Sequence, residues 1–562
     1  MKNVYTKWLA SNLPQYLKDE LNAIQESDKD IEDRFYQYLS FGTGGMRGIL
    51  GAGTNRMNIF TIRRVAEGLA RYIASNGDEA KKRGVVIAYD TRHFSKEFAV
   101  ETARVLGAHG IRSYVYKESR PTPQLSFTVR ELHAFAGVVI TASHNPKQYN
   151  GFKVYGEDGA QLVPAGANAL IQHMNAIKEL FEISVADLAS LEEQGICRWI
   201  LEELDASYLT NLLTLKDDVK ADFNIKIVYT PLHGAGLVPV MNGLKQFGFD
   251  NVYLVEQQAI QDGTFPTVSY PNPEESAAFK LAMELGKQVR ADLLLATDPD
   301  ADRLGVAVRN GEGYELLTGN QLGALLFHYL LHTKQANGLL PINGVMIKTI
   351  VTAELGTKIA THFNIDTINT LTGFKFIAEK IEEYEQTSEH SFLFGYEESY
   401  GYLIKTFARD KDAVQVALKV AEMAAHYAMY GKTLLDALND LFKQFGYHRE
   451  ALVSKVFEGK DGQVQMKAIL DDLRENVPTE VAGVSVVRVE DYLKGIATLA
   501  NGATELINLP KENVLKLYLA DNSWIAIRPS GTEPKCKYYF GVVADTEEEA
   551  EERLNRLVHL QL

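Results

Sequence analysis

The chain of 562 residues contains only two cysteines, Cys197 and Cys536. Two cysteines provide neither a disulfide framework nor the spacing of a metal-binding cluster, and this scarcity is typical of a reducing compartment. We therefore interpret both as packing residues, with a reactive thiol as the lesser alternative.

Long hydrophobic runs are also missing. No segment is apolar over the length needed to cross a bilayer, and residues 1–7 lead into mixed polar sequence without the apolar core of a signal peptide. Low-complexity tracts and long linkers are absent as well. We expect a cytoplasmic protein whose parts pack closely.

Positive charge is in deficit, because 58 Lys and Arg stand against 73 Asp and Glu and give a net charge of −15. Nucleic acids and membrane surfaces are bound mainly through Lys and Arg, so we expect neither as a partner. Any phosphate site must be a local concentration of basic groups. The composition is otherwise that of a soluble globular protein, and the length predicts about three or four domains.

The spacing of Leu13, Leu17, Leu21 and Ile24 predicts helix near the start. A pattern of strand, helix and second strand then occurs three times. The first strands are expected at residues 85–89, 225–229 and 345–350, and the second at 138–140, 293–296 and 392–394. Each second strand runs into a polar loop, at residues 141–146, 297–303 and 395–401.

Ligands bind at the carboxyl ends of strands in α/β folds, so the pattern predicts three related α/β domains that each supply one loop to a common cleft. The three segments share this pattern and not residue identities, so the alternative is that the similarity arose by chance. Strands at residues 484–489, 514–519, 524–527 and 538–543, with a helix at 546–556, predict a smaller α+β domain. The expected domains are residues 1–200, 201–310, 311–440 and 441–562.

The loop Thr-Ala-Ser-His-Asn-Pro at residues 141–146 places the hydroxyl of Ser143 where a buried strand ends. An isolated serine here would be a turn residue or a helix cap. The other loops favour a chemical role.

The segment from Asp298 to Arg303 puts three carboxylates, Asp298, Asp300 and Asp302, at alternate positions after a strand. Clustered like charges repel unless a cation lies between them, so we predict a Mg²⁺ site. An EF-hand begins in the same way, but it requires glycine at its sixth position and glutamate at its twelfth, where this chain has Arg303 and Arg309. A solvated acidic turn is the alternative.

Three further segments support a chemical role when they are considered together with these two loops. Residues 41–48 combine four glycines with Arg47, residues 395–401 present Glu397 and Ser399 between glycines, and residues 528–535 combine Arg528 with Ser530, Gly531 and Thr532 as an anion cradle. Each alone would be an ordinary turn or hairpin. Together, a nucleophilic serine, a metal loop, a sugar-binding loop and a phosphate cradle describe phosphoryl transfer on a phosphorylated sugar.

These loops, at 141–146, 298–303, 397–399 and 528–534, resemble in sequence and order the four signature loops of the α-D-phosphohexomutases. Residues 41–48 resemble the branch of that family with bacterial phosphoglucomutases and phosphoglucomutase/phosphopentomutase relatives. The resemblance implies four domains around a central cleft, three of them α/β and the last α+β. It also implies that Ser143 carries a phosphoryl group and binds one Mg²⁺ together with Asp298, Asp300 and Asp302.

The resemblance also implies roles for individual residues. Lys153 matches a candidate general base, with an electrostatic clamp as the equal alternative, and His144 serves at most to orient the serine loop. Arg47, Arg303 and Lys411 match basic groups near the reacting atoms. The substrate-binding residues implied are Glu397 and Ser399 for sugar hydroxyls, Gly373 and Lys375 for sugar orientation, and Arg528, Ser530, Gly531 and Thr532 for the phosphate that is not transferred.

The activity implied is interconversion of glucose 1-phosphate and glucose 6-phosphate, with glucose 1,6-bisphosphate as intermediate and activator. Phosphomannomutase or phosphopentomutase activity by the same mechanism is the nearest alternative, because the tyrosines at 396 and 400 leave the sugar preference open. A metal-dependent sugar phosphatase and a catalytically silent sugar-phosphate binder are more distant ones. We expect a small phosphosugar as the only partner and a monomer or weak dimer.

Overall fold

The computed structural model describes residues 1–42, 45–457, 459–529 and 535–560. The chain forms two compact units, one made of Met1–Leu322 and Phe374–Thr433 and the other of Gly323–Gly373 and Leu434–Leu562. Both cysteines are buried free thiols, as expected.

The first unit begins with three short helices, α1 (Lys2–Ala10), α2 (Gln15–Ala23) and α3 (Asp28–Phe35). The expected helical start is confirmed, and Leu17 and Leu21 are buried in α2. Edge-on contacts of Trp8 with Phe35 and Phe60, at 5.7 and 5.6 Å between ring centroids, help to form a small apolar core there.

A mixed sheet of seven strands follows, in the order β1-β2-β6-β5-β3-β4-β7. The four strands β5, β3, β4 and β7 run parallel, and β6, β2 and β1 are antiparallel additions. Its strands are β1 (Phe41–Gly42), β2 (Gly45–Ile49), β3 (Val85–Tyr89), β4 (Ser113–Tyr116), β5 (Ala136–Ile140), β6 (Tyr149–Tyr155) and β7 (Cys197–Ile200). The described parts of the glycine-rich segment, β1 and β2, thus pair antiparallel on the edge of this sheet.

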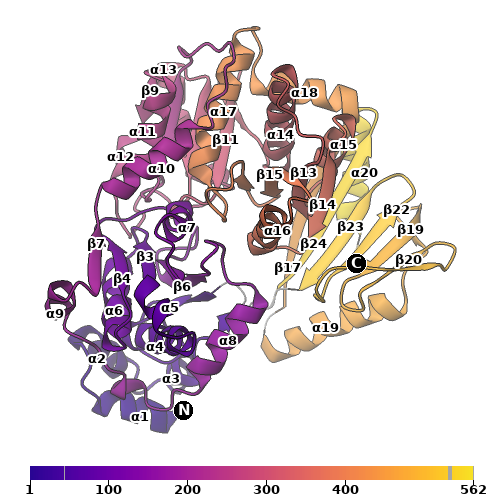
Figure 1. Ribbon diagram of the computed structural model, residues 1–562. Helices are drawn as coiled ribbons and strands as arrows, with labels where there is room; N and C mark the ends of the chain where they lie inside the picture. Colours follow the sequence, from indigo (N-terminus) through magenta and orange to yellow (C-terminus); the bar gives the residue numbers. More distant parts are fainter. Residues whose placement is uncertain (43–44, 458, 530–534, 561–562) are drawn as a thin grey trace. The chain divides into compact units, whose positions relative to one another are not determined.

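Helices cover both faces of the sheet, because alternate residues of β3 enter different apolar cores. Val85 and Ile87 pack with residues of α4 and α6, whereas Val86 and Ala88 pack with residues of α7. Figure 1 shows β3 and β4 in indigo to purple, with α6 beside them. The helices here are α4 (Ile59–Ser75), α5 (Asp78–Arg83), α6 (Ser95–Ala108), α7 (Thr122–Glu131), α8 (Pro164–Asn175), η1 (Leu180–Glu182) and α9 (Leu188–Glu193).

The second sheet of the first unit has the order β12-β11-β10-β8-β9, with β10, β8 and β9 parallel. Its strands are β8 (Ile227–Thr230), β9 (Val252–Leu254), β10 (Leu293–Thr297), β11 (Leu304–Asn310) and β12 (Gly313–Leu316). The helices around it are α10 (Glu203–Leu213), α11 (Leu237–Phe247), α12 (Glu256–Ala259), η2 (Ser276–Phe279) and α13 (Lys280–Val289).

The last part of the first unit is α16 (Phe374–Thr387), β15 (Ser391–Glu397), β16 (Gly401–Leu403) and α17 (Ala413–Ala428). The loop expected at residues 395–401 is shorter than predicted, because β15 and β16 pair as a hairpin up to Glu397 and Gly401. Tyr396 continues the strand since its ring is buried and stacks on Phe394 at 5.4 Å.

Helix α14 (Gly319–Ala336) starts in the first unit and continues into the second. The second unit then contains the parallel pair β13 (Gly344–Thr349) and β14 (Asp366–Thr370), with α15 (Leu355–His362) between them in the chain and α18 (Leu434–Phe445) after them. The expected first strand of the third repeat is therefore present as β13.

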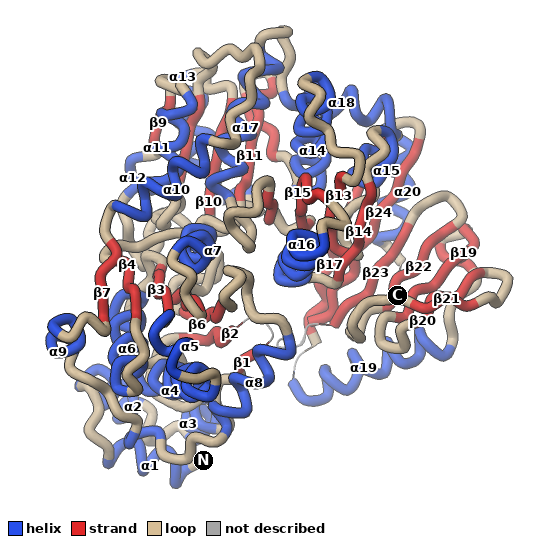
Figure 2. Tube along the Cα trace, in the orientation of Figure 1, coloured by secondary structure: helices blue, strands red, loops and turns tan. Residues whose placement is uncertain are grey.

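An antiparallel sheet with the order β17-β24-β23-β22-β19-β20-β21 completes the second unit, and β18 pairs with β19. The expected strands correspond to β19, β22, β23 and β24, and the expected helix to α20. The elements are β17 (Tyr447–Val456), α19 (Gly459–Glu475), β18 (Glu480–Val481), β19 (Val484–Asp491), β20 (Ile496–Leu499), β21 (Thr504–Leu506), β22 (Leu515–Leu519), β23 (Trp524–Pro529), β24 (Lys535–Ala544) and α20 (Glu547–Val558). Figure 2 shows this unit as a sheet in red with α19 and α20 in blue.

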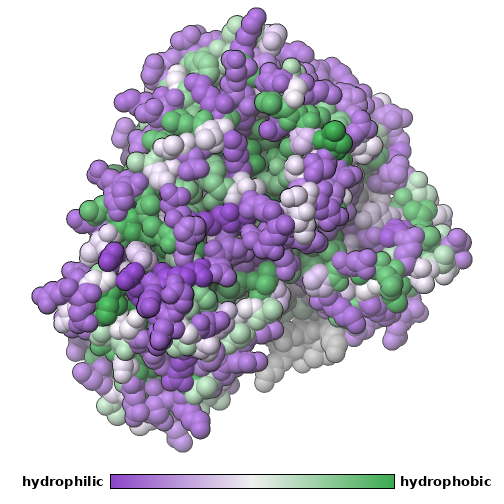
Figure 3. Space-filling model, viewed as in Figure 1, coloured by the Kyte–Doolittle hydropathy of each residue, from purple (hydrophilic) through white to green (hydrophobic). Residues whose placement is uncertain are grey.

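Among the described residues, no helix combines the length and the apolar character needed to cross a membrane. The face of the molecule in Figure 3 is mainly hydrophilic, and hydrophobic side chains occur on it in small separate groups.

Candidate active site

Ser143 lies in the loop that follows β5, a strand whose five residues are all buried. Its φ of 52° is left-handed, a conformation that residues with a Cβ seldom adopt. The side chain of Thr141 accepts a hydrogen bond from the Ser143 amide at 2.8 Å. Gly151 of β6 lets the loop approach closely, because a Cβ there would lie 2.5 Å from the Thr141 carbonyl oxygen.

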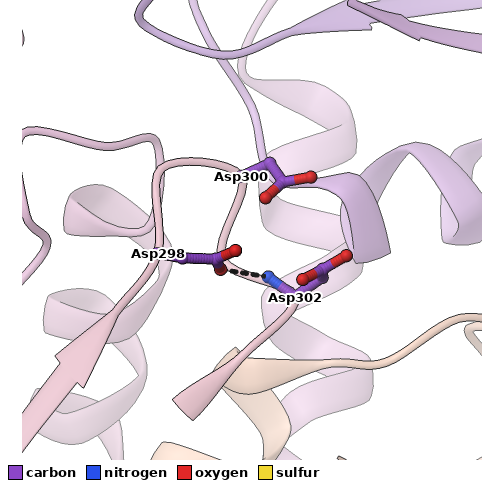
Figure 4. A group of neighbouring side chains, drawn as sticks. All are labelled: Asp298, Asp300 and Asp302. Atoms are coloured by element: carbon purple, nitrogen blue, oxygen red, sulfur yellow. Dashed lines mark hydrogen bonds between the residues drawn. The ribbon is translucent and has the colours of Figure 1, made fainter. Parts of the chain in front are cut away.

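The three predicted metal ligands lie in the loop between β10 and β11. Asp298 organises this loop, since its Oδ1 accepts hydrogen bonds from the amides of Asp302 at 3.1 Å and Arg303 at 3.0 Å. Figure 4 shows the three carboxylates along one turn of chain, with the Asp302 amide directed at Asp298. One oxygen of each carboxylate lies within 4.8 Å of the others, and all three residues are buried.

The serine loop and the acidic loop meet directly. Ser143 Oγ donates to Asp298 Oδ2 at 2.7 Å across 155 residues of chain. Thr122, at the start of α7, donates its hydroxyl to Asp300 Oδ2 at 2.8 Å and its amide to the Asp300 carbonyl at 2.9 Å. The hydroxyl that the sequence singled out therefore lies in contact with the acidic group.

Three cations surround the carboxylates. Lys153 Nζ of β6 lies 3.0 Å from Asp300 Oδ2, and Lys411 Nζ lies 3.2 Å from Asp302 Oδ2. Arg303 Nε lies 3.9 Å from Asp302 Oδ1, while its guanidinium also pairs with Glu274. Glycine at 401 makes room for Lys411, because a Cβ there would lie 2.1 Å from the Lys411 Cδ.

These charges move the pKa values of Asp298 and Asp302 in opposite directions. Burial and the charges of Asp300 and Asp302 raise the pKa of Asp298 well above its ordinary value. Burial acts in the same direction on Asp302, but Lys411 and Lys153 outweigh it and hold the pKa of Asp302 below its ordinary value. Asp298 thus holds a proton more readily than Asp302 does.

The same interactions act on Lys153. Burial lowers its pKa, but Asp300 and Asp302 outweigh burial, so the pKa of Lys153 is raised. With the carboxylates around it unliganded, Lys153 is therefore a cation, the form that the clamp alternative requires. The role as general base stays a prediction.

The acidic group has unused hydrogen-bonding capacity. Within the described part of the chain, Asp300 Oδ1 and Asp302 Oδ1 are buried and accept no hydrogen bond. Buried carboxylate oxygens without partners are costly, and a set made only of carboxylate oxygens suits a hard divalent cation. Asp298, Asp300 and Asp302 together could hold such an ion.

Two more of the predicted residues lie near this group. Arg47 in β2 donates from Nη1 to the Asn145 side chain at 3.2 Å, which places its guanidinium against the serine loop. Glu397, at the end of β15, is 5 % exposed, and its charge contributes to the raised pKa values of Arg303 and Lys411. The hairpin that carries Glu397 is tied to the acidic loop, since the Leu304 amide donates to the Tyr400 carbonyl at 3.1 Å.

The other three residues predicted to bind the sugar lie on different segments of the chain. Ser399 lies in the turn between β15 and β16, half-buried. Lys375 lies in the first turn of α16 and is buried. Gly373, at the end of the preceding segment in the second unit, has a φ of 120° that favours glycine.

The phosphate cradle is only partly described. Arg528 lies in β23 of the second unit and donates from Nε to Glu512 at 3.0 Å. Ser530, Gly531 and Thr532 lie outside the described residues.

Several contacts at the site were not predicted from the sequence. Asp410 accepts a hydrogen bond from Tyr155 at 2.7 Å and contacts Lys411 Nζ at 3.0 Å, which fixes that lysine beside Asp302. Its position next to Lys411 was a usable signal. Thr122 belongs to no motif, and only the fold brings it to Asp300.

Comparison with known proteins gives matches along most of the chain. Sequence models described as phosphoglucomutase/phosphomannomutase, alpha/beta/alpha domains I, II and III, match residues 38–181, 206–311 and 318–445. The model described as the C-terminal domain of the same family matches residues 466–558.

Phosphoglucomutase from Staphylococcus haemolyticus (strain JCSC1435) is 42% identical over 521 residues, which are 92% of this chain and 93% of that protein. Phosphoglucomutase from Staphylococcus epidermidis (strain RP62A) is 40% identical over 547 residues, 97% of either chain. Among solved structures, the open form of the Paramecium phosphoglucomutase pp63/parafusin has a TM-score of 0.69 at 17% identity, covering 92% of this chain and 93% of that one. At this low identity, the similarity to the Paramecium structure shows the fold alone.

Proposed function

This chain belongs to the phosphoglucomutase/phosphomannomutase family, and we propose that within it the protein is an α-phosphoglucomutase that interconverts glucose 1-phosphate and glucose 6-phosphate. The resemblance read from the sequence is confirmed, and so is the fold class of three α/β domains followed by an α+β domain. The relatives named phosphoglucomutase match over nearly their full length, which favours the same activity here.

One observation supports the chemistry most strongly. Ser143 Oγ lies 2.7 Å from a carboxylate of a buried acidic group that is surrounded by Lys153, Lys411 and Arg303. A hydroxyl in that setting can carry a phosphoryl group whose charge is balanced by fixed cations. Phosphoryl transfer needs positioning and electrostatic stabilisation more than any other help from the protein.

In the first half of the reaction, phosphorylated Ser143 gives its phosphoryl group to the free hydroxyl of glucose 1-phosphate. The bond between phosphorus and Ser143 Oγ breaks, a bond to the sugar 6-oxygen forms, and the sugar hydroxyl loses its proton. The proton ends on Ser143 Oγ, the leaving oxygen. Lys153 either relays it there as a general base or, in the clamp alternative, stays a cation that stabilises the transferring group while the proton passes to Ser143 Oγ. The product of this half is glucose 1,6-bisphosphate with a free Ser143.

In the second half, the bisphosphate is turned around and its 1-phosphoryl group returns to Ser143, which leaves glucose 6-phosphate. Glu397 and Ser399 would bind sugar hydroxyls in both orientations, with Gly373 and Lys375 helping to set them. Arg528, Ser530, Gly531 and Thr532 would hold the phosphate that is not reacting. Arg47, Arg303 and Lys411 would neutralise the phosphate at Ser143.

We propose one Mg²⁺ in each site, held by Asp298, Asp300 and Asp302 together with the phosphate on Ser143. Bound there, it would neutralise the charge that develops on the transferring group. The unpaired buried oxygens of Asp300 and Asp302 support this assignment.

The location, oligomeric state, partners and domain limits are proposed from the sequence. We propose a cytoplasmic enzyme that is a monomer or weak dimer, with glucose 1,6-bisphosphate as activator and no nucleic-acid or membrane partner. The domains would be residues 1–200, 201–310, 311–440 and 441–562, each carrying one of the four loops.

A substrate panel tests the proposed function. Glucose, mannose, ribose and N-acetylglucosamine 1-phosphates are supplied with Mg²⁺ and a trace of the bisphosphate, and the 6- or 5-phosphate products and free phosphate are measured. We expect glucose 1-phosphate to give the highest kcat/KM. A higher value for mannose or ribose 1-phosphate would assign a phosphomannomutase or phosphopentomutase, and stoichiometric free phosphate would assign a phosphatase.

A further inference from the structure

The polar turn after β3 packs against the serine loop through one arginine. The Arg92 side chain is completely buried. Its Nη2 donates to the carbonyl oxygens of Ser143 and Asn145, and its Nη1 donates to those of Pro146 at 2.9 Å and Tyr149 at 3.2 Å. A single guanidinium therefore binds four carbonyl groups of one loop.

The guanidinium is itself held on its other sides. Its Nε forms an ion pair with Asp90 Oδ2 at 3.2 Å, without the geometry of a hydrogen bond, and the Asp90 side chain is also completely buried. Asp90 is fixed in turn, since its Oδ1 accepts from the Ser95 hydroxyl at 2.7 Å and from the Arg92 amide at 2.9 Å. The ring of Phe265 lies 4.9 Å from the guanidinium carbon. Arg92 is thus enclosed by the serine loop, Asp90 and Phe265.

A buried ion pair of this kind is not explained by stability alone. Both charges lose their hydration on burial, and replacement of such a pair by apolar side chains is often neutral or stabilising. What the guanidinium supplies, and an apolar side chain cannot, is a rigid fork of donors that fixes several carbonyl groups at once.

The loop it binds has a conformation that needs such support. Ser143 has a left-handed φ of 52°, which persists only where surrounding contacts enforce it. The same conformation directs Ser143 Oγ toward Asp298 at 2.7 Å. Three of the four carbonyl groups bound by Arg92 lie at or within three residues of Ser143.

We propose that Arg92 is a positioning residue for phosphoryl transfer: by binding the carbonyl groups of residues 143, 145, 146 and 149, it holds Ser143 where its Oγ faces the acidic group. The inference rests on the proposed function, because it assigns to Arg92 the alignment of the transferring oxygen. Misplacement of a reacting atom by about 1 Å costs on the order of 10²-fold in rate.

The test compares R92M, R92K and the double variant D90N/R92M with the wild type. R104M is the matched control, since Arg104 also donates to a backbone carbonyl, that of Ala186 at 3.0 Å, and to a carboxylate, that of Glu101 at 2.8 Å. The kcat and the KM for glucose 1-phosphate are measured per mole of enzyme that can be phosphorylated on Ser143, so that misfolded protein is not counted.

We expect kcat to fall about 100-fold in R92M with KM within twofold of wild type, and to fall less in R92K, whose ammonium can replace some of the bonds. The double variant removes both buried charges, so it should regain stability but stay slow. R104M should keep its kcat within twofold. A kcat near wild type in D90N/R92M, or a KM that rises in step with the loss, would show that Arg92 only stabilises the fold.

Hydrogen exchange of the peptide spanning residues 141–149 supplies a readout that does not depend on activity. It should be faster in R92K and D90N/R92M and unchanged in R104M; unchanged exchange in all variants would overturn the proposal. If R92M does not fold, R92K and the double variant decide. If the wild type converts no sugar phosphate, the proposed function fails, and exchange alone still tells whether Arg92 holds the loop.

Discussion

Two clusters of charge, one in each unit, differ in how completely their atoms are paired. In the first unit, Asp298, Asp300 and Asp302 have cations around them, yet Asp300 Oδ1 and Asp302 Oδ1 accept no hydrogen bond from the described residues. In the second unit, Glu354 lies between two buried lysines, with Oε1 at 3.2 Å from Lys348 Nζ and 3.5 Å from Lys516 Nζ.

The cluster around Glu354 makes several further hydrogen bonds. Lys516 also donates to the Ile350 carbonyl at 2.7 Å, Lys348 to the Thr352 carbonyl at 3.1 Å, and Thr357 donates to Glu354 Oε2 at 2.8 Å. Paired charges fix local structure, whereas clustered buried carboxylate oxygens without a hydrogen bond remain available to a cation. The first cluster is therefore expected to control activity and the second to control stability.

The largest expected effect is at Ser143. Ser143→Ala removes the atom that carries the phosphoryl group, so turnover should fall about 10⁴-fold or more, with the melting temperature nearly unchanged. Steady-state kinetics and thermal unfolding measure the two quantities. Ser113→Ala, at a buried serine of β4 outside the site, is the control and should keep its activity. Mutase activity at the wild-type level in Ser143→Ala would contradict the mechanism.

The next effect concerns the acidic group. Asp300→Asn should lower kcat about 10²-fold and raise the Mg²⁺ concentration needed for half-maximal activity about 10-fold, because it removes a charge from the proposed ligand set. Titration of activity with Mg²⁺ measures both. Asp292→Asn, at a half-exposed carboxylate that pairs with Arg309 at 2.6 Å, should change neither. Normal turnover after exhaustive chelation would show that the metal has no role in the reaction.

The sequence predicted the acidic group better than the contacts around it. Asp298, Asp300 and Asp302 could be recognised because strand, spacing and like charge all coincide within six residues. Ser143 was recognisable through the same strand-to-loop transition. Thr122 and Arg92 were not, since each acts through a contact with a residue far away in the chain, and local pattern carries no information on such contacts. Asp410 adjoins Lys411 in the sequence, but its contact with Tyr155 also depends on the fold.

The same reasoning applies to the fold. Buried strands of β-branched residues, such as β3 and β5, were found because their composition is distinctive. The hairpin of β15 and β16 was predicted as a longer loop, because Gly395 and Glu397 look like loop residues until Tyr396 is seen packed on Phe394. Strand β17 was not predicted, since its burial alternates with exposed positions and it reads as polar sequence.

In the second unit, Glu354→Gln should act on stability. Burial raises the pKa of Glu354, but Lys348 and Lys516 outweigh it and lower the pKa to about 2, so the group is charged at neutral pH. Its neutralisation would leave two buried lysines without a counter-charge, which should lower the free energy of unfolding by about 3 kcal/mol.

Urea-induced unfolding measures that change. Glu505→Gln, which disrupts the exposed pair with Arg488 at 2.5 Å, should change it by less than about 1 kcal/mol. Equal and small effects for the two variants would show that the cluster around Glu354 does not stabilise the second unit.

The smallest effect is a pH dependence at His448 in β17. Burial and the charge of Lys358 lower its pKa to about 4, and its Nε2 has no hydrogen-bond partner among the described residues. An unfolded histidine has a pKa of about 6.5, so the unfolded chain takes up the proton first. The stability that neutral His448 contributes is therefore present above pH about 6.5 and is lost as the pH falls toward 4.

Between pH 7 and 5 this loss should be about 2 kcal/mol, measured as a fall in the free energy of unfolding. His448→Gln should make that fall smaller by a similar amount. His559→Gln, at an exposed histidine near the end of α20, should leave it as in the wild type. An unaltered pH profile in His448→Gln would refute the assignment.

The most direct test of the central claim follows the phosphoryl group itself. The enzyme is labelled on Ser143 with radioactive phosphate, freed of excess label, and mixed with unlabelled glucose 1-phosphate and Mg²⁺ for a single turnover. We predict that the label leaves Ser143 and appears in glucose bisphosphate and glucose 6-phosphate, without free phosphate. Label that stays on the protein while product forms, or that appears as inorganic phosphate, would contradict the account.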